Sequence, residues 1–309
     1  MQISIIFFMN ICIDIERKND DMTKTSRDNR TFWIFIGPCL FAFVTVVIIP
    51  FFIGIYYTFT DWNGANPKYN FVGLSNYLYV FKDAQFIYSF KISLIYTFGS
   101  VITINAIGFG LAYIVTRNLK TKNILRTGFF MPNLIGGLIL GFIWQFMFNS
   151  VFTGIGEKIG SSILSTSMLQ EPNTAVLAML IVSTWQYAGY IMVIYISALE
   201  NVPTDLIEAA RIDGANGIQV FRHITIPMVR QGMTVCLFLT LANSFKMFDL
   251  NFSLTPSKST EMLALNIYKE AFVTNNMGIG QAKAIIFFIL VTAISLTQVY
   301  FNKKKEVEA

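Results

Sequence analysis

Long stretches without any Asp, Glu, Lys or Arg divide the chain into six apolar segments. A helix needs about 20 apolar residues, at about 1.5 Å rise each, to cross the hydrocarbon core of a bilayer. The charge-free stretches are residues 31–60, 92–116, 127–156, 172–199, 231–245 and 284–302. The fifth is short, but it can span if Arg230 snorkels at one end and the apolar run continues to Leu254. The pattern predicts an all-α polytopic membrane protein with six transmembrane helices.

The composition agrees with a chain that lies in a bilayer. Hydrophobic residues make up 54% of the chain and charged residues 13%, with a mean hydropathy of +0.56. Soluble domains average about 25% charged residues. The net charge of +5 is typical of basic cytoplasmic loops in a membrane protein, so no nucleic-acid partner is expected. Cys12, Cys39 and Cys236 have no CxxC spacing and predict neither a disulfide nor a metal site.

The placement of the basic residues predicts the orientation of the chain. With both ends inside the cell, 15 of the 23 Lys and Arg residues fall on the inner side. The loop at residues 117–126 is the most informative, because it holds four basic residues and no acid. Positively charged loops resist translocation. Both termini are therefore predicted to be cytoplasmic.

The chain divides into a cytoplasmic N-terminal segment (1–30), a transmembrane domain (31–303) and a cytoplasmic tail (304–309). Residues 1–13 are apolar but too few to span, and acids follow where a secretory signal would have small residues. Two interpretations stay open for this segment. Translation starts near Met22, or the first residues form an ordered amphipathic lead.

The connection between the fourth and fifth spans, residues 200–230, has an unusual composition for a loop. Thr204 or Asp205 can cap a short helix, and Gly214 can end it with a positive φ. A second short helix is expected at residues 216–223. The result is a helical projection with exposed apolar groups, which suits either a partner protein or the surface of the lipid.

A motif in this connection resembles the EAA loop of the permease subunits of ABC importers. The matching residues are Glu208, Ala209, Ala210, Gly214, Ile224 and Pro227. Ile226 stands where the family usually has leucine. The resemblance implies the type I ABC importer permease fold, in which this loop is a coupling helix that docks in a groove of an ATPase subunit.

Other segments resemble the carbohydrate branch of that family, of the maltose and glycerol-phosphate type. The similar segments are residues 37–38, 61–62, 71–77, 126–132 and 245–249, and the resemblance covers about residues 32–303. One departure lies at residues 254–258, where the family often has Gly-Gly-Pro after Leu-Thr. This departure concerns the shape of the outer gate.

The resemblance implies a transporter of several subunits in a bacterial cell membrane. It implies a second homologous permease subunit, two ATP-binding subunits and an extracytoplasmic solute-binding protein that delivers a sugar. The chain has no Gly-x-x-x-x-Gly-Lys-Ser/Thr sequence to cradle phosphates. ATP and Mg are therefore expected in the partner ATPase, with no cofactor and no enzymatic activity in this chain.

The resemblance also implies which residues couple the permease to the ATPase. The expected coupling residues are Glu208, Ala209, Ala210, Arg211, Asp213, Gly214 and Phe221. Arg211 and Asp213 are weaker choices for contact with the ATPase, because charged groups of a loop more often form a solvated or intraloop ion pair. His223, the single histidine, is expected to be a capping or contact group.

A sugar pathway needs hydrogen-bond partners for hydroxyls and aromatic faces for the C–H sides of the ring. The candidates in the fourth and fifth spans, at positions similar to sugar-lining ones in the family, are Gln186, Tyr187, Tyr190, Asn243, Ser244, Lys246 and Met247. The alternative for each is a helix–helix hydrogen bond or an interface anchor. The same residue types suit oligosaccharides, sugar alcohols and glycerol phosphates.

Other polar or aromatic residues in the spans are expected to have structural roles. Asn105, Trp144 and Gln145 are predicted to pack between helices. Lys246 and Asp249 are three residues apart, so on one helix they would share a face and form a structural ion pair near the outer interface.

Two other classes of protein compete with the importer interpretation. An ion-coupled secondary transporter of a small polar solute would be expected to bury acids in mid-helix, and the five clear spans contain none. A membrane-embedded enzyme would need a nucleophile with a base or a cluster of metal ligands, which one histidine and three separate cysteines do not supply.

Overall fold

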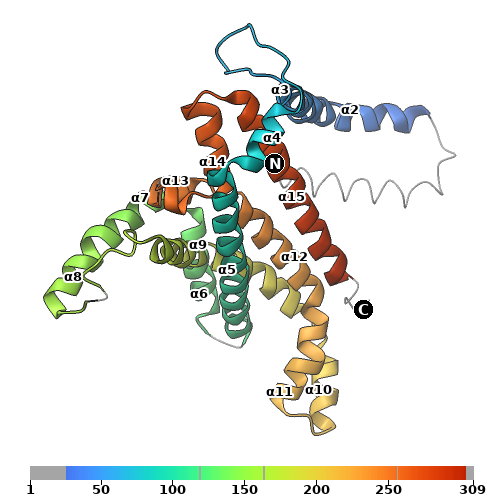
Figure 1. Cartoon of the computed structure of the whole chain (residues 1–309). Coiled ribbons are helices and arrows are strands. Elements are labelled where there is room, and N and C mark those ends of the chain that lie inside the picture. The colour runs from blue at the N-terminus through green and yellow to red at the C-terminus, as the bar shows by residue number, and fades with distance from the viewer. Residues whose placement is uncertain (1–25, 118–119, 163, 256, 304–309) are drawn as a thin grey trace. The chain divides into compact units, whose positions relative to one another are not determined.

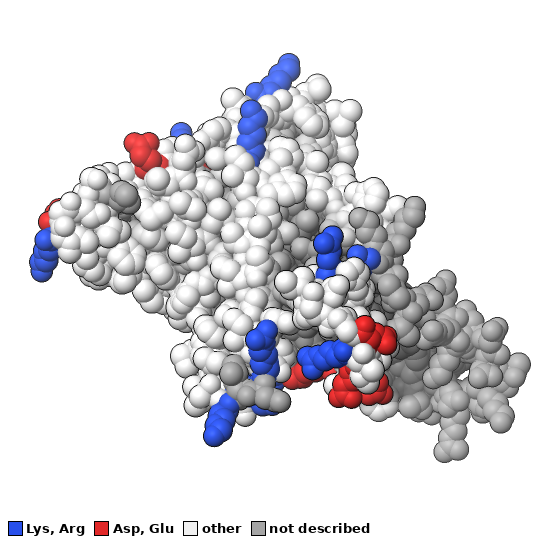
Figure 2. Space-filling view, turned by 90° about the horizontal axis from the view of Figure 1, so that it is seen from below, with Lys and Arg blue, Asp and Glu red and all other residues white. Residues whose placement is uncertain are grey.

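The computed structural model describes residues 26–117, 120–162, 164–255 and 257–303. Within these ranges the structure is helical, and the one β feature is an isolated bridge between Thr60 and Phe71. Six helical segments there are long and apolar enough to cross a membrane: Phe32–Tyr57, Ala84–Val115, Gly137–Ile159, Pro172–Glu200, Gly217–Phe245 and Met277–Asn302. Figure 2 shows broad areas of surface without charged side chains. The predicted all-α, six-span membrane protein is confirmed, while the predictions for residues 1–25 and 304–309 lie outside the described residues.

The chain divides into two compact units, residues 1–56 and 57–309. The described part of the first consists of α2 (Ser26–Phe43), a π-helical turn (Val44–Ile48) and α3 (Ile49–Tyr57), which reaches the unit boundary. Many large apolar side chains of this unit are exposed, among them Phe35 and Phe41. Lipid would cover such side chains in a membrane span.

The second unit is built around α9 (Pro172–Glu200), which packs against α5 (Ala84–Val115) and α12 (Ile226–Phe245). α15 (Met277–Lys303) lies against α12 and α4 (Ser75–Lys82). A glycine allows α5 and α9 to approach closely, because a Cβ at Gly108 would lie 2.9 Å from Cγ2 of Ile191 and 3.1 Å from the carbonyl oxygen of Ala188. Small residues at such crossings favour close packing of membrane helices.

The third span is broken, so the continuous helix predicted for residues 127–156 is wrong at its start. The segment consists of α6 (Lys122–Phe130), a 3₁₀ turn (Met131–Leu134), α7 (Gly137–Phe146), a π-helical turn (Met147–Val151) and α8 (Phe152–Ile159). Ile135 is extended, with φ −81° and ψ 126°. Pro132 has no backbone N–H to donate, and Gly136 and Gly137 are poor helix formers, so the helix breaks between α6 and α7.

The fifth span extends beyond its charge-free stretch at the start, whereas the sequence predicts an extension at the end. α11 (Gly217–Val220), a π-helical turn (Phe221–Thr225) and α12 form one continuous span, Gly217–Phe245. The helix ends at Phe245, and α13 (Asp249–Leu254) begins after a break, so the predicted continuation to Leu254 is wrong. Lys246 and Asp249 therefore share no helical face, and the described residues contain no ion pair between them. That predicted pair is also wrong.

The segment after α12 packs back onto the helix bundle. It continues from α13 through a 3₁₀ turn (Lys258–Thr260), α14 (Leu263–Tyr268) and a π-helical turn (Lys269–Val273). Asn251 donates from Nδ2 to the Thr260 carbonyl at 2.9 Å and accepts from Met262 N at 2.9 Å. Leu263 N donates to Ser93 Oγ of α5 at 2.9 Å. These bonds give the non-helical backbone partners in place of water.

The Asn-Tyr pair in the family-like segment at residues 71–77 has a structural role. Asn76 Nδ2 donates to the carbonyl oxygens of Thr58 and Thr60, both at 2.8 Å, and Tyr77 donates from its hydroxyl to Thr58 Oγ1 at 2.9 Å. The start of α4 is thereby attached to the chain that precedes it.

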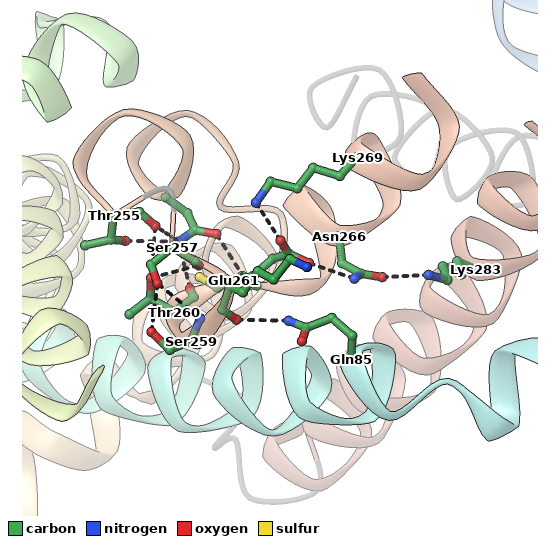
Figure 3. Close-up of polar contacts among 12 residues, drawn as sticks. Gln85, Thr255, Ser257, Ser259, Thr260, Glu261, Asn266, Lys269 and Lys283 are labelled. Atoms are coloured by element: carbon green, nitrogen blue, oxygen red, sulfur yellow. Dashed lines mark hydrogen bonds and ion pairs between the residues drawn. The ribbon is translucent and has the colours of Figure 1, made fainter. Parts of the chain in front are cut away.

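A buried ion cluster connects the starts of α5 and α15 with the turn after α14. Lys283 is 0% exposed, and its Nζ lies 2.7 Å from Asp83 Oδ2 and 2.6 Å from Glu270 Oε2. The same Nζ donates to Asn266 Oδ1 at 3.1 Å, and Asn266 in turn donates to Glu261, which pairs with Lys269 (Figure 3). Burial alone would raise the pKa of Asp83 and of Glu270, but the bonds from Lys283 and other donors outweigh it and lower both below the ordinary 3.8 and 4.5.

We predict that Lys283→Met destabilises the subunit strongly, by about 3–5 kcal/mol, because Asp83 and Glu270 keep their burial and lose their shared cation. Thermal unfolding of the purified protein in detergent measures the effect as a lower midpoint.

The pH dependence of the thermal unfolding midpoint is the control for the Lys283→Met prediction. In the wild type the lowered pKa values contribute stability above about pH 4.5, and this stability is lost as the pH falls through the folded-state values. In Lys283→Met the two acids are buried without a cation, so mild acidification should relieve the destabilisation. Equal midpoints for the two proteins at neutral pH would contradict the role of the cluster.

Candidate functional site

A small cavity lies between α5, α9 and α12. The lining residues are Tyr96, Ile104, Tyr187, Tyr190, Ile191, Thr240, Asn243, Ser244 and Met247. The space open to the centre of a water molecule is about 10 Å³, which is room for about one water. Aromatic rings, an amide and hydroxyl groups converge from three helices on this cavity.

Most of the predicted pathway residues line this cavity. Tyr187 and Tyr190 are three residues apart on α9, so they share a helical face. Asn243 and Ser244 lie in the last turn of α12, and Met247 follows the end of that helix. The structure brings these five together, and their contact with a solute stays a prediction.

Gln186 lies outside the cavity and donates a hydrogen bond to the broken third span instead. Its Nε2 donates to the carbonyl oxygen of Ile135 at 3.0 Å, in the extended segment between α6 and α7. Non-helical backbone inside a membrane protein needs such a partner because lipid offers none. α9 also approaches the break closely at Gly189, where a Cβ would collide with the carbonyl oxygen of Phe129. Lys246 likewise lies outside the cavity and is exposed beyond the end of α12.

The sequence interpretation missed four lining residues: Tyr96, Ile104, Ile191 and Thr240. For Tyr96 a signal exists, because hydroxyl residues recur at spacings of three or four along an otherwise apolar helix, at Ser89, Ser93, Tyr96 and Ser100. In a membrane helix such a row indicates a face turned toward the protein interior.

Of the three residues expected to pack between helices, Asn105 and Trp144 do so. Asn105 of α5 donates to Thr240 Oγ1 of α12 at 3.2 Å and accepts from the Tyr195 hydroxyl of α9 at 2.9 Å. The ring of Trp144 lies near those of Phe148 and Trp185, with centroids 5.5 and 5.6 Å apart, in a tilted and an edge-to-face arrangement. The bonds of Asn105 connect the three helices that form the walls of the cavity, and the contact of Trp144 with Trp185 connects α7 to α9.

The helical projection lies at the end of the second unit away from α14 (Figure 1). It consists of α10 (Thr204–Ile212) and α11, joined by a turn in which Gly214 has φ +83°, as predicted. Asn216 and Gln219 form a capping box at the start of α11. The predicted cap at Thr204 or Asp205 is wrong, because Pro203 holds the cap position without a side-chain bond, and its fixed φ suits that place.

The predicted coupling residues differ in exposure. Glu208, Ala209, Arg211, Asp213 and Gly214 are exposed, and Ala210 is half-buried. Ile212 and Ile218 are 86% and 77% exposed, so apolar side chains project from both short helices. Within the described part of the chain Arg211 and Asp213 form no ion pair.

Phe221 has a different position, packed against α5. Its ring centroid lies 6.0 Å from that of Phe109 and 5.2 Å from that of Tyr113. This aromatic contact attaches the projection to the bundle. His223 Nδ1 lies 3.0 Å from the Gln219 carbonyl oxygen, one helical turn earlier, which is a local contact as expected.

The fold is that of ABC importer permeases. The chain superposes on a chain of a bacterial ABC transporter involved in the import of alginate with a TM-score of 0.78, at 19% sequence identity, covering 96% of this chain and 99% of that one. Residues 104–307 match the family described as the binding-protein-dependent transport system inner membrane component, and the chain belongs to this family of multi-pass membrane proteins.

Two relatives show how far the similarity extends. The chain is 48% identical over 280 residues to the probable starch degradation products transport system permease protein AmyD of Thermoanaerobacterium thermosulfurigenes, covering 90% of this chain and 95% of the relative. It is 32% identical over 278 residues to the multiple sugar-binding transport system permease protein MsmF of Streptococcus mutans, covering 89% and 96%. The resemblance found in the sequence is thereby confirmed.

We predict that Gln186→Leu lowers the stability of the subunit by about 1–3 kcal/mol, because the Ile135 carbonyl loses its partner in a buried place. Thermal unfolding in detergent measures the change. Gln145→Leu is the matched control, since Gln145 has no hydrogen bond to another described residue. A control variant as unstable as Gln186→Leu would contradict the assigned role.

Proposed function

We propose that this chain is the permease subunit of an ATP-driven, binding-protein-dependent sugar importer, in which it forms half of the translocation pathway. The cavity carries this proposal. The rings of Tyr187 and Tyr190 offer flat faces for the C–H sides of a sugar, and Asn243 and Ser244 offer donors and acceptors for hydroxyls. The names of two relatives, which concern starch degradation products and multiple sugars, support a carbohydrate substrate.

The proposed complex contains a second homologous permease, two ATP-binding subunits and an extracytoplasmic solute-binding protein. The family description refers to binding-protein dependence. A similar solved structure, at 19% identity, is an alginate transporter in complex with a periplasmic protein that holds a pentasaccharide. ATP and Mg bind to the partner ATPase subunit. In this complex α10, α11 and both termini of the chain lie on the cytoplasmic side of the membrane.

The proposed coupling runs through a continuous helix. Exposed Glu208, Ala209 and Gly214 contact a groove of the ATPase, with Ile212 and Ile218 supplying apolar area. α11 continues without a break into α12, whose last turn forms one wall of the cavity. Closure of the ATPase dimer would therefore move the cavity wall as part of a near-rigid body and exchange an inward for an outward opening.

The test is uptake of labelled maltotriose into proteoliposomes that hold the assembled complex and its binding protein. The proposal expects uptake that requires ATP inside and stops without ATP hydrolysis. Uptake that persists without ATP and stops when a proton or sodium gradient collapses would support an ion-coupled secondary transporter instead. No uptake of maltotriose or of any sugar in a wider panel would overturn the sugar assignment.

We predict that Gly214→Asp leaves the subunit inserted but abolishes solute-stimulated ATP hydrolysis and uptake. Gly214 has φ +83° and no neighbouring atom within 4 Å of an added Cβ, so the substitution strains the turn and adds a charge to the docking surface without a clash inside the subunit. Gly217→Ala is the control, because a Cβ there also meets nothing within 4 Å and the backbone is helical. Normal uptake by Gly214→Asp would refute the docking role.

We predict that Asn243→Ala lowers ATP-dependent uptake about 2- to 10-fold at unchanged protein level, which is the effect of one lost hydrogen bond to the solute. Val235→Ala is the control on the same helix, since Val235 is exposed on the outside of the bundle and does not line the cavity. If both variants transport equally well, the assignment of the cavity to the solute pathway fails.

A further inference from the structure

The break between α12 and α13 holds two exposed charged side chains. Lys246 follows the last residue of α12 and Asp249 is the first residue of α13, and both side chains are exposed. Within the described residues neither forms an ion pair. The Ser253 hydroxyl donates to the backbone carbonyl of Asp249 at 2.8 Å, which leaves the carboxylate without a partner in the described chain. Charged groups are rare inside membrane proteins, so this carboxylate requires an explanation.

Asp249 lies at the level of the middle of the spans rather than at their ends. A Cβ added to Gly137, at the start of α7, would lie 2.8 Å from Cβ of Asp249 and 3.3 Å from its Oδ2. The carboxylate is also close enough to Tyr187 for an electrostatic interaction with the hydroxyl of that residue. Tyr187 is near the middle of α9, about 20 Å from each end at about 1.5 Å per residue. A side chain at this depth that faced outward would be surrounded by lipid.

The chemistry of the exposed surface shows which side faces lipid and which faces water. Charged side chains inside a bilayer face the bundle interior or a water-filled space, and they mark the paths of solutes. Lys246, in the same break, has the same requirement as Asp249. On α7, Ile139 is two residues from Gly137 and therefore on the opposite side of the helix, and it is 63% exposed and apolar. The side of α7 that carries Asp249 thus faces water, and the side that carries Ile139 faces lipid.

The start of α7 does not account for the carboxylate. A negative charge near the N-terminus of a helix is favourable. However, Gly136 at the cap position of α7 has no side-chain cap bond, and Asp249 accepts no hydrogen bond from the first turn of that helix. A residue with a capping role would bond to these N–H groups, and it would not need to be exposed to water.

The carboxylate lies beside the cavity. Met247, two residues earlier in the chain, and Tyr187 both line the cavity, which has room for about one water. A sugar is much larger than a water molecule, so the space must widen before a sugar can enter it. The exposed carboxylate next to Tyr187 then joins the wall of the widened space.

We infer that Asp249 contacts the solute and accepts hydrogen bonds from sugar hydroxyls when the pathway opens. The two oxygens of one carboxylate can accept from two neighbouring hydroxyls of a sugar ring. The ring of Tyr187, beside the carboxylate, offers a flat face to the C–H side of the same sugar. The inference rests on the proposed sugar importer and adds an acidic residue to the specificity of its pathway.

The first test compares Asp249→Asn with the wild type in the full complex reconstituted with its binding protein. The loss of the charged acceptor should lower the rate of ATP-dependent maltotriose uptake about 10-fold. The thermal midpoint in detergent should stay equal, because the carboxylate has no partner in the described chain. Glu157→Gln is the matched control, since Glu157 is an exposed acid of α8 that forms no ion pair with a described residue and does not line the cavity. This variant should keep the uptake rate.

The second test measures whether residue 249 faces water in the assembled complex. A cysteine-free chain that carries Asp249→Cys is treated with a charged, water-soluble thiol reagent, and Ile139→Cys is the control for the lipid side. The thiolate is the reactive form, and it exists only where water reaches the sulfur. Residue 249 should be labelled and residue 139 should not.

Three results would overturn the inference while wild-type uptake remains intact. The first is an unchanged uptake rate in Asp249→Asn. The second is a lower rate together with a lower thermal midpoint, which indicates a structural role at the start of α7. The third is residue 249 unlabelled in the assembled complex, which indicates that lipid or the second permease covers it. Failure of the wild-type complex to transport any sugar would instead refute the proposed function, so the two failures are distinguishable.

Discussion

Polar groups inside the membrane spans must find partners within the protein, because lipid offers no hydrogen bonds. Lys283 meets this constraint with Asp83 and Glu270, and the Ile135 carbonyl meets it with Gln186. Asn105 meets it by bonding to side chains of two other helices. These satisfied groups hold the bundle together.

The arrangement of helices connects the two ends of the proposed mechanism. The projection of α10 and α11 has exposed apolar side chains at one end, and the span Gly217–Phe245 runs from it to the cavity. Phe221 packs against Phe109 and Tyr113, so movement of the projection also acts on α5. Two of the three walls of the cavity are thus attached directly to the proposed docking surface.

The sequence was sufficient for the six spans, the Gly214 turn and most of the cavity, because these depend on apolar length, on backbone preference and on family resemblance. It was insufficient where tertiary contacts decide, since residue type could not show that Gln186 donates to the Ile135 carbonyl while Tyr187 lines the cavity. The break at Ile135 has a local signal in Pro132, Gly136 and Gly137, which the length of a charge-free stretch does not use. The pair of Lys246 and Asp249 failed because the helix ends at Phe245.

The central claim is that the projection contacts an ATP-hydrolysing subunit in the cytoplasm. Cross-linking tests it most directly, in a cysteine-free chain that carries Ile212→Cys, with Lys68→Cys as the control for the outer side. The account predicts that residue 212 cross-links to the ATPase subunit in membranes and is protected from an impermeant thiol reagent added outside, which labels residue 68. Labelling of residue 212 from outside, or no cross-link in the assembled complex, would contradict it.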